Sequence, residues 1–153
     1  MKKPSENSLR PNWLTIEDFQ FICFNLAKEL LEFSEPIPDY SKKDDSLLES
    51  ALSAPRNSYE FKNSSLAEQT AVLFYSLIKN HPFSNGNKRI AVISVLVFLI
   101  LNDKWLNILP VKLYEAAVLV ANSSPQEREL VVNEIAKIFE EFIVTNKKKV
   151  PRN

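Results

Sequence analysis

Residues 81–101 read HPFSNGNKRIAVISVLVFLIL, a polar loop that leads directly into an apolar run. The loop holds the single histidine and the single glycine of this 153-residue chain, His81 and Gly86. At the average glycine usage of roughly 7%, a chain of this length carries about ten glycines. Glycine suits a backbone that turns with positive φ or approaches a ligand closely, and histidine moves protons near neutral pH. The loop is therefore predicted to combine a general base with a binding site.

The apolar run from Ile90 to Leu101 predicts a helix, and only Ser94 interrupts it. The run is shorter than the roughly 20 apolar residues that a membrane-spanning helix needs. A helix that is apolar nearly all round is typical of the centre of a domain, where other helices surround it. The sequence therefore predicts a central core helix and no membrane partner.

The residues Gly86 to Arg89 open this helix, just where unpaired backbone amides and partial positive charge favour an anion. Lys88 and Arg89 are cations at the helix end that disfavours them, so a bound phosphate would offset their cost. A turn glycine, a surface histidine and solvated cations each explain one residue alone. Their coincidence within one loop favours a phosphate site beside the base His81, with Phe83 as a buried anchor.

Upstream of the loop, three segments are predicted. Thr15 is a candidate N-cap, and the helix that it opens has one apolar face, made of Ile16, Phe19, Ile22, Cys23, Leu26, Leu30 and Phe33. A short helix over 46–53 should stop before Pro55, because the residue ahead of proline disfavours the α region. Residues 54–63 lack a helical period, and Tyr59 and Phe61 alternate with polar neighbours, which predicts a small strand or hairpin.

The remaining helices are indicated by their ends. Ser65 and Glu68 form a capping-box pattern that opens a helix running to about Lys79. Residues 102–104 break the chain, and Pro110 fits the first turn of a helix that reaches about residue 121. Ser124, followed by a proline and then a glutamate at 127, opens a last helix that is predicted to end near residue 146.

Composition limits the classes of function. Lysine plus arginine equals aspartate plus glutamate, 19 against 19, which argues against the strongly basic surface of a nucleic-acid-binding domain. The basic tail over 147–152 is interpreted as a solvated terminus rather than a nucleic-acid contact. A single cysteine, Cys23, is expected to be a small buried hydrophobe in a reducing cytoplasm, and the polar N-terminus lacks the pattern of a signal peptide. One domain is expected over 1–153, with a core at about 14–144 and loose tails at 1–12 and 147–153.

The loop His81–Arg89 resembles the signature of the Fic/Doc family, His-x-Phe-x-(Asp/Glu)-Gly-Asn-(Gly/Lys)-Arg. Residues 47–55, LLESALSAP, are similar to the segment that precedes the flap in its death-on-curing (Doc) branch. The resemblance covers about residues 14–144. It implies a mainly α, compact domain of about six helices with a short β-hairpin flap. It also implies an enzyme that moves part of a nucleotide onto a hydroxyl of a target protein.

The resemblance assigns roles to the loop residues. His81 corresponds to the general base that takes the proton of the target hydroxyl. Gly86, Asn87 and Lys88 would form the anion loop, and Arg89 would hold the phosphates during transfer. His81, Lys88 and Arg89 are therefore the expected catalytic residues, with ATP as the nucleotide and Mg²⁺ as the metal ion.

The resemblance also places a target-aligning flap over 56–61. Its residues Arg56, Asn57, Ser58 and Tyr59 would line up the target chain by strand-like pairing.

Two departures from the family pattern bear on the reaction. Lys88 stands where adenylylating members have glycine, and Val92 stands where they have a second arginine. Both favour the Doc branch, in which the γ-phosphate is transferred instead of AMP. Asn85 replaces a metal-binding acid, and its neutral carbonyl oxygen would weaken a Mg²⁺ site.

The leading prediction is a cytoplasmic Doc-like toxin that phosphorylates a protein, with elongation factor Tu as the family-based target. Protein adenylylation by the same fold is the first alternative. A catalytically weak regulatory or binding module, suggested by Asn85, is the second. No segment matches the inhibitory Ser/Thr-x-x-x-Glu-Gly/Asn helix of the family, so a separate antitoxin is the expected partner.

Overall fold

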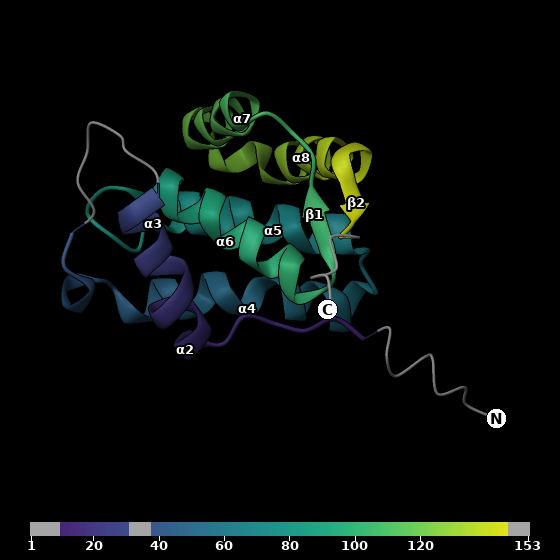
Figure 1. Cartoon of the computed structure of the whole chain (residues 1–153). Coiled ribbons are helices and arrows are strands. Elements are labelled where there is room, and N and C mark those ends of the chain that lie inside the picture. The colour runs from purple at the N-terminus through teal and green to yellow at the C-terminus, as the bar shows by residue number, and fades with distance from the viewer. Residues whose placement is uncertain (1–9, 31–37, 147–153) are drawn as a thin grey trace, which may run out of the picture.

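The computed structural model describes residues 10–30 and 38–146 of the chain (Figure 1). These residues are mainly α-helical, and they also form a small antiparallel sheet of two strands. The predicted fold class is therefore confirmed. None of the helices in these ranges combines the length and the apolarity that crossing a membrane requires. The N-terminal lead-in up to residue 9 and the basic tail over 147–152 lie outside the described residues, as does Phe33.

The helix α6 (Asn87–Leu101) occupies the middle of the molecule beside α5 (Leu66–Asn80). In Figure 1, α4 (Asp45–Lys62) runs below this pair, and α7 (Pro110–Asn122) and α8 (Arg128–Phe142) lie above it. Side chains are buried all round α6, from Ile90 through Leu99 with few exceptions. The prediction of a central helix is confirmed. The N-terminus of α6 lies at the edge of the core.

The first helical segment consists of α2 (Ile16–Asp18), the π-helical turn η1 (Phe19–Phe24) and α3 (Asn25–Leu30). Thr15 is its N-cap, as predicted, and forms a reciprocal capping box with Asp18. The buried face differs in part from the predicted one: Phe19 and Cys23 are buried, but Ile22 is 38% exposed. A π turn adds a residue to the helical period, so the face that meets the core moves on to Phe24 and Ala27.

The helix α4 corrects two predictions. It does not stop before Pro55 but runs on to Lys62, so that residues 56–61 are helical and form no strand or hairpin. Pro55 is buried on the same stripe as Leu48, Ala51 and Leu52, which is the i, i+3, i+4, i+7 spacing of a core-facing helix. Packing of this stripe against α5 offsets the roughly 3 kcal/mol that proline costs inside a helix.

The chain after α6 also differs from expectation at one place. The predicted break at 102–104 and the helix that begins at Pro110 are confirmed. The capping box of Ser124 and Glu127 is also confirmed, and it opens the 3₁₀ turn η3 (Pro125–Glu127) that precedes α8. The last helix, however, ends at Phe142, and Ile143–Thr145 forms the strand β2.

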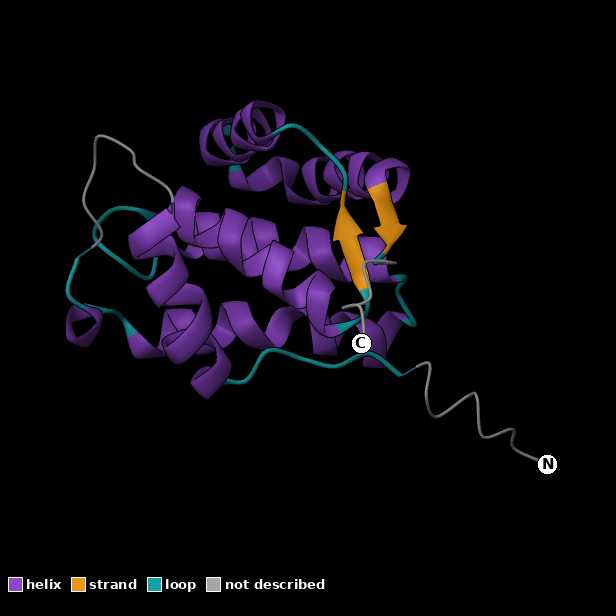
Figure 2. Ribbon diagram, viewed as in Figure 1, coloured by secondary structure: helices purple, strands orange, loops and turns teal. Residues whose placement is uncertain are grey.

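The strand β2 pairs antiparallel with β1 (Lys104–Leu106), and Trp105 lies opposite Val144 (Figure 2). Three β-branched residues in succession, Ile143, Val144 and Thr145, favour a strand over the continuation of a helix. The amide of Asn107 donates to the carbonyl of Phe142 at 2.8 Å, and that of Asn146 donates to Asp103 at 2.9 Å. The sheet therefore fixes the end of α8 to the turn that follows α6.

Candidate active site

The loop between α5 and α6 is shaped by two residues in the left-handed region. His81 is the C-cap of α5 at φ 54° and ψ 54°, and Gly86 is the N-cap of α6 at φ 77° and ψ 7°. The single glycine thus stands where a positive φ is required, which is the reason for its presence in a chain otherwise without glycine. Among the described residues, no side chain caps the N-terminus of α6.

The side chain of Asn87 holds the loop in shape. Its Oδ1 accepts from the amide of Phe83 at 3.1 Å, and its Nδ2 donates to the carbonyl of the same residue at 2.8 Å. The ring of Phe83 is 2% exposed and stacks on Phe24 with ring centres 5.3 Å apart and on Phe19 at 6.2 Å. The burial and ring contacts of Phe83 hold the loop against the core, and the Asn87 amide supports the loop from within.

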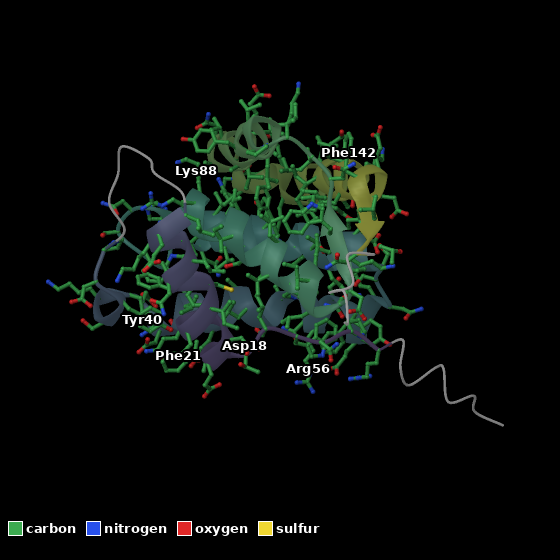
Figure 3. The ribbon with its side chains drawn as sticks, in the orientation of Figure 1. Asp18, Phe21, Tyr40, Arg56, Lys88 and Phe142 are labelled. Carbon is green, nitrogen blue, oxygen red and sulfur yellow. The ribbon has the colours of Figure 1, made fainter. Side chains whose placement is uncertain are left out.

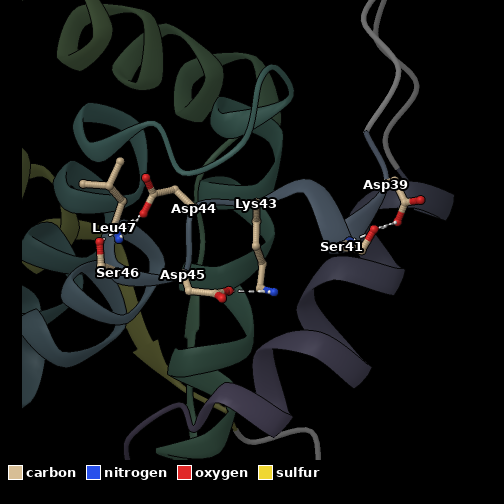
Figure 4. Close-up of polar contacts among 7 residues, drawn as sticks. All are labelled: Asp39, Ser41, Lys43, Asp44, Asp45, Ser46 and Leu47. Carbon is tan, nitrogen blue, oxygen red and sulfur yellow. Dashed lines mark hydrogen bonds and ion pairs between the residues drawn. The ribbon is translucent and has the colours of Figure 1, made fainter.

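The start of α4 supports the other side of the loop. The carbonyl of Pro82 accepts from the amide of Asp44 at 2.9 Å, and Asn80 Nδ2 donates to the carbonyl of Leu47 at 3.0 Å. The carboxylate of Asp44 caps α4 by accepting from the amide of Leu47 and from the hydroxyl of Ser46 (Figure 4). These hydrogen bonds lower the pKa of Asp44. The N-terminus of α4 is thereby fixed next to His81.

Two further contacts order the chain that enters α4. The side chain of Asp39 accepts hydrogen bonds from the amide and the hydroxyl of Ser41, both at 3.0 Å, which lowers the pKa of Asp39. Lys43 pairs with Asp45 at 2.9 Å (Figure 4). Residues 39–45 therefore contain the short 3₁₀ turn η2 (Tyr40–Lys42) and lead in a fixed path to the cap at Asp44.

A pocket of about 510 Å³ opens at the loop. Its lining includes the expected base, His81, and three residues of the expected anion loop, Gly86, Asn87 and Lys88. The base and most of the loop therefore lie around one space. Ser84, Asn85 and three residues outside the loop, Ile78, Lys79 and Ala121, complete the lining. Arg89 is not in the lining; it is 6% exposed, inside the first turn of α6.

The pocket has a positive electrostatic character. The first turn of α6 holds no acidic residue, and the partial positive charge of the helix end adds to the charge of Lys88. Lys79 contributes a second cation to the lining. A phosphate chain is the ligand class that such a site stabilises.

Lys79 is a residue that the sequence analysis did not assign to the site. Its Nζ donates to the carbonyl of Ser123 at 2.6 Å and to that of Ala121 at 3.4 Å. A cation at carbonyls that end a helix is favourable, and here it fixes the end of α7 to the end of α5. No pattern in the sequence indicates this contact, because it joins residues 44 positions apart.

Asn85 is the one loop residue considered for a metal ion. Its Oδ1 is buried and has no hydrogen-bond partner among the described residues. Within 10–30 and 38–146, no group of three or more His, Cys, Asp or Glu side chains is placed to hold a metal. Mg²⁺ is commonly bound by one or two protein oxygens together with substrate phosphates and water. Asn85 Oδ1 fits such a role as a single neutral ligand.

The four residues expected in a flap do not lie at the pocket. Arg56 pairs with Glu60 at 3.3 Å, and Tyr59 packs against Trp13 with ring centres 5.6 Å apart. At the rise of an α-helix, Arg56 is about 18 Å along α4 from the loop contact at Asp44. Figure 3 labels Arg56 and Lys88 at well-separated places. Asn57 and Ser58 line a different groove, between α4 and α5.

Cys23 takes no part in the site. Its side chain is fully buried, as predicted, and burial raises the pKa of its thiol from 9.0 to about 12. A thiol with so high a pKa remains protonated and unreactive at neutral pH.

The sequence matches the model of the Fic/DOC family over residues 13–99, which is more than half of the chain. Comparison with curated proteins and with solved structures finds no match. Members of this family are nucleotide transferases that act on proteins and generally use ATP and a divalent metal ion. The matched range includes α4, α5, the loop 81–89 and nearly all of α6, and this chain belongs to the Fic/DOC family.

Proposed function

We propose that this protein is a Doc-like protein kinase, which transfers the γ-phosphate of ATP to a hydroxyl of a target protein. The observation that carries the proposal is the pocket in which His81 lies together with Lys88 and the uncapped N-terminus of α6. A base and an anion site around one space are the two elements that phosphoryl transfer to a hydroxyl requires.

In the proposed reaction, His81 accepts the proton of the target hydroxyl as its oxygen attacks the γ-phosphorus. A new P–O bond forms to the target, the bond between the γ-phosphorus and the β–γ bridging oxygen breaks, and ADP leaves with that electron pair. Lys88 and the amides of the α6 N-terminus stabilise the negative charge on the phosphate oxygens. Mg²⁺, when bound with the nucleotide, supplies further charge neutralisation, and Asn85 Oδ1 would hold it.

Phosphoryl transfer is preferred over adenylylation because of two residues. Lys88 places a long cationic side chain at the pocket, where adenylylating members of the family have glycine. Val92, where such members have a second arginine, is 8% exposed on α6 and contributes no charge. These two residues support a phosphate chain bound as in the Doc branch. Transfer of AMP by the same residues is the alternative.

A toxin role and an antitoxin partner follow from the same proposal. Modification of an essential protein such as elongation factor Tu would arrest growth. Since the chain carries no segment that matches the family's inhibitory helix, restraint would come from a separate antitoxin protein in the cytoplasm.

A regulatory or binding module with weak catalysis is the second candidate, and Asn85 is the observation that favours it. The amide oxygen is neutral, so Mg²⁺ would depend on the nucleotide for most of its binding. In this case the pocket would bind a nucleotide without rapid transfer. A growth test separates the two: expression of His81→Ala should leave growth normal if catalysis is the cause of arrest, and should arrest it like wild type if binding is.

The decisive experiment uses ATP labelled separately at the α- and γ-phosphates, with purified elongation factor Tu as the acceptor. The proposal expects label on the acceptor from the γ position only, with wild type, and none with His81→Ala. Lys112→Ala, which removes an exposed cation on α7, is the matched control and should behave as wild type. Label from the α position alone would identify an adenylyltransferase instead.

A further inference from the structure

We infer that the groove between α4 and α5 binds an acidic segment of the target protein and brings its hydroxyl to His81. This inference rests on the proposed function, because it names the class of chain that the same active site accepts. The groove has a volume of about 450 Å³ and is separate from the nucleotide pocket.

The groove has the length and the position of a peptide site. Its α4 wall runs from Ser50 to Lys62, about 18 Å at the rise of an α-helix, which matches about five residues of extended chain. Asn80 lines one end of it and is followed directly by His81, which lines the nucleotide pocket. A chain lying in the groove would therefore pass next to the expected base.

The lining suits a polypeptide of defined charge. Two cations, Lys62 and Arg128, line the groove, and no carboxylate does. The guanidinium of Arg128 lies over the ring of Tyr75, 5.3 Å from its centre, which holds this charge at the groove. The nearby carboxylate of Glu60 is engaged elsewhere, with Arg56 and Arg10. Charge complementarity thus points to acidic residues in the bound segment.

Apolar and amide groups provide the remaining contacts. The ring of Phe61 is 85% exposed at the far end of the groove, where it offers an apolar contact to a bound chain. Asn57 and Ser76 add hydrogen-bonding side chains to the two walls. Because both walls are α-helical, their backbone groups are satisfied within the helices. The target must therefore be aligned by side chains and not by strand pairing, which replaces the expected flap contact.

The test is a binding titration followed by nuclear magnetic resonance on the full-length protein without nucleotide. The probe is a short peptide in which Glu and Asp alternate with Leu, and its partner probe has Lys in place of every acid. The acidic peptide is expected to shift the amide signals of Asn57, Lys62 and Ser76, and the basic peptide to leave them unchanged. Added salt should weaken the binding.

Charge reversal provides the matched variants. Lys62→Glu with Arg128→Glu is expected to weaken binding of the acidic peptide about tenfold or more. Lys112→Glu with Lys137→Glu carries the same change in charge at exposed positions outside the groove and should bind as wild type. The inference would be overturned if both peptides bound equally well, or if both double variants lost affinity for the acidic peptide equally. It would also be overturned if the amide shifts were confined to another surface.

A second measurement identifies the occupant. With a threonine added to the peptide end that lies near Asn80, label from ATP should reach the acidic peptide, and the Lys62/Arg128 variant should raise KM for the peptide without changing kcat. If the bound peptide instead displaces ATP and blocks transfer, the groove serves an inhibitory partner, and the assignment to the target is overturned. If the acidic peptide binds in the groove but the protein transfers no phosphate from ATP, the proposed kinase activity is contradicted, whereas the peptide-binding role of the groove is not.

Discussion

Asn85 is the residue on which the metal requirement of the site depends. Asn85→Asp replaces a neutral amide oxygen by a carboxylate at the same place, and Mg²⁺ prefers charged oxygen ligands. We expect the Mg²⁺ concentration for half-maximal transfer to fall about tenfold, which corresponds to roughly 1.4 kcal/mol of binding free energy. The measurement is a Mg²⁺ titration of the transfer rate, with Asn85→Ala as the control that removes the oxygen. A Mg²⁺ dependence that is unchanged by the carboxylate would show that this residue does not touch the metal.

Cys23 gives a prediction about stability at high pH. The thiol has a pKa of about 12 in the folded protein against 9.0 in the unfolded chain, so above pH 9 the unfolded state loses the proton first. Stability should therefore fall as the pH rises from 9 toward 12, by at most about 1.4 kcal/mol per pH unit.

The check is urea unfolding of the wild type and of Cys23→Ala at several pH values. The difference between them isolates the thiol, because tyrosine and lysine titrate equally in both. The variant should lose stability less steeply than the wild type above pH 9, although a small cavity lowers its stability at neutral pH. Parallel curves across this range would contradict the assignment.

At the scale of elements, the helical state of residues 56–61 is the main departure from what the sequence pattern indicates. Asn57 is exposed in the middle of α4, so its substitutions report backbone preference with little packing. In a helix, alanine is favoured over asparagine by about 0.5 kcal/mol, and glycine is disfavoured by several tenths. In a hairpin turn the order is the opposite, because glycine suits the positive φ of such turns.

We therefore expect Asn57→Ala to raise the free energy of unfolding and Asn57→Gly to lower it. Urea denaturation followed by circular dichroism gives both values. The reverse order would mean that these residues form the turn of a flap, and it would remove the α4 wall of the groove.

Local signals account for the elements that could be predicted from the sequence. The capping boxes at Thr15 and Ser65 each involve side chains three residues apart, so their pattern is complete in a short window. The turn glycine and the central helix are equally local. The strand β2 is different: its β-branched residues become a strand only because β1 lies beside them, far away in sequence.

The same distinction holds for the site. His81, Gly86 and Lys88 are neighbours in sequence, and the structure places all of them at one pocket. Lys79 could not be assigned, because its contact with Ser123 depends on the packing of α5 against α7. The course of α4 through Pro55 could not be predicted either, since burial against α5 decides it and local preference opposes it.

At the scale of the whole molecule, helices from both halves of the chain converge on the N-terminus of α6. The loop is fixed by Phe83 in an aromatic cluster from the first helical segment, by Asp44 at the start of α4 and, through Lys79, by the end of α7. A preorganised loop of this kind binds a phosphate without paying a further ordering cost. The central claim is that this loop is the nucleotide site.

The most direct test is to add ATP with Mg²⁺ to the isotope-labelled protein and to record the amide resonances, since this requires no target. The largest shifts are expected at His81 and at residues 84–88, with small ones at Lys79 and none at 56–59. Lys88→Ala should weaken ATP about tenfold or more, as the loss of a charged hydrogen bond implies, and Lys112→Ala should not. Residues 81–89 are not the nucleotide site if ATP leaves their amide signals unchanged. The same conclusion follows if ATP shifts the amide signals of a different surface equally in the wild type and in Lys88→Ala.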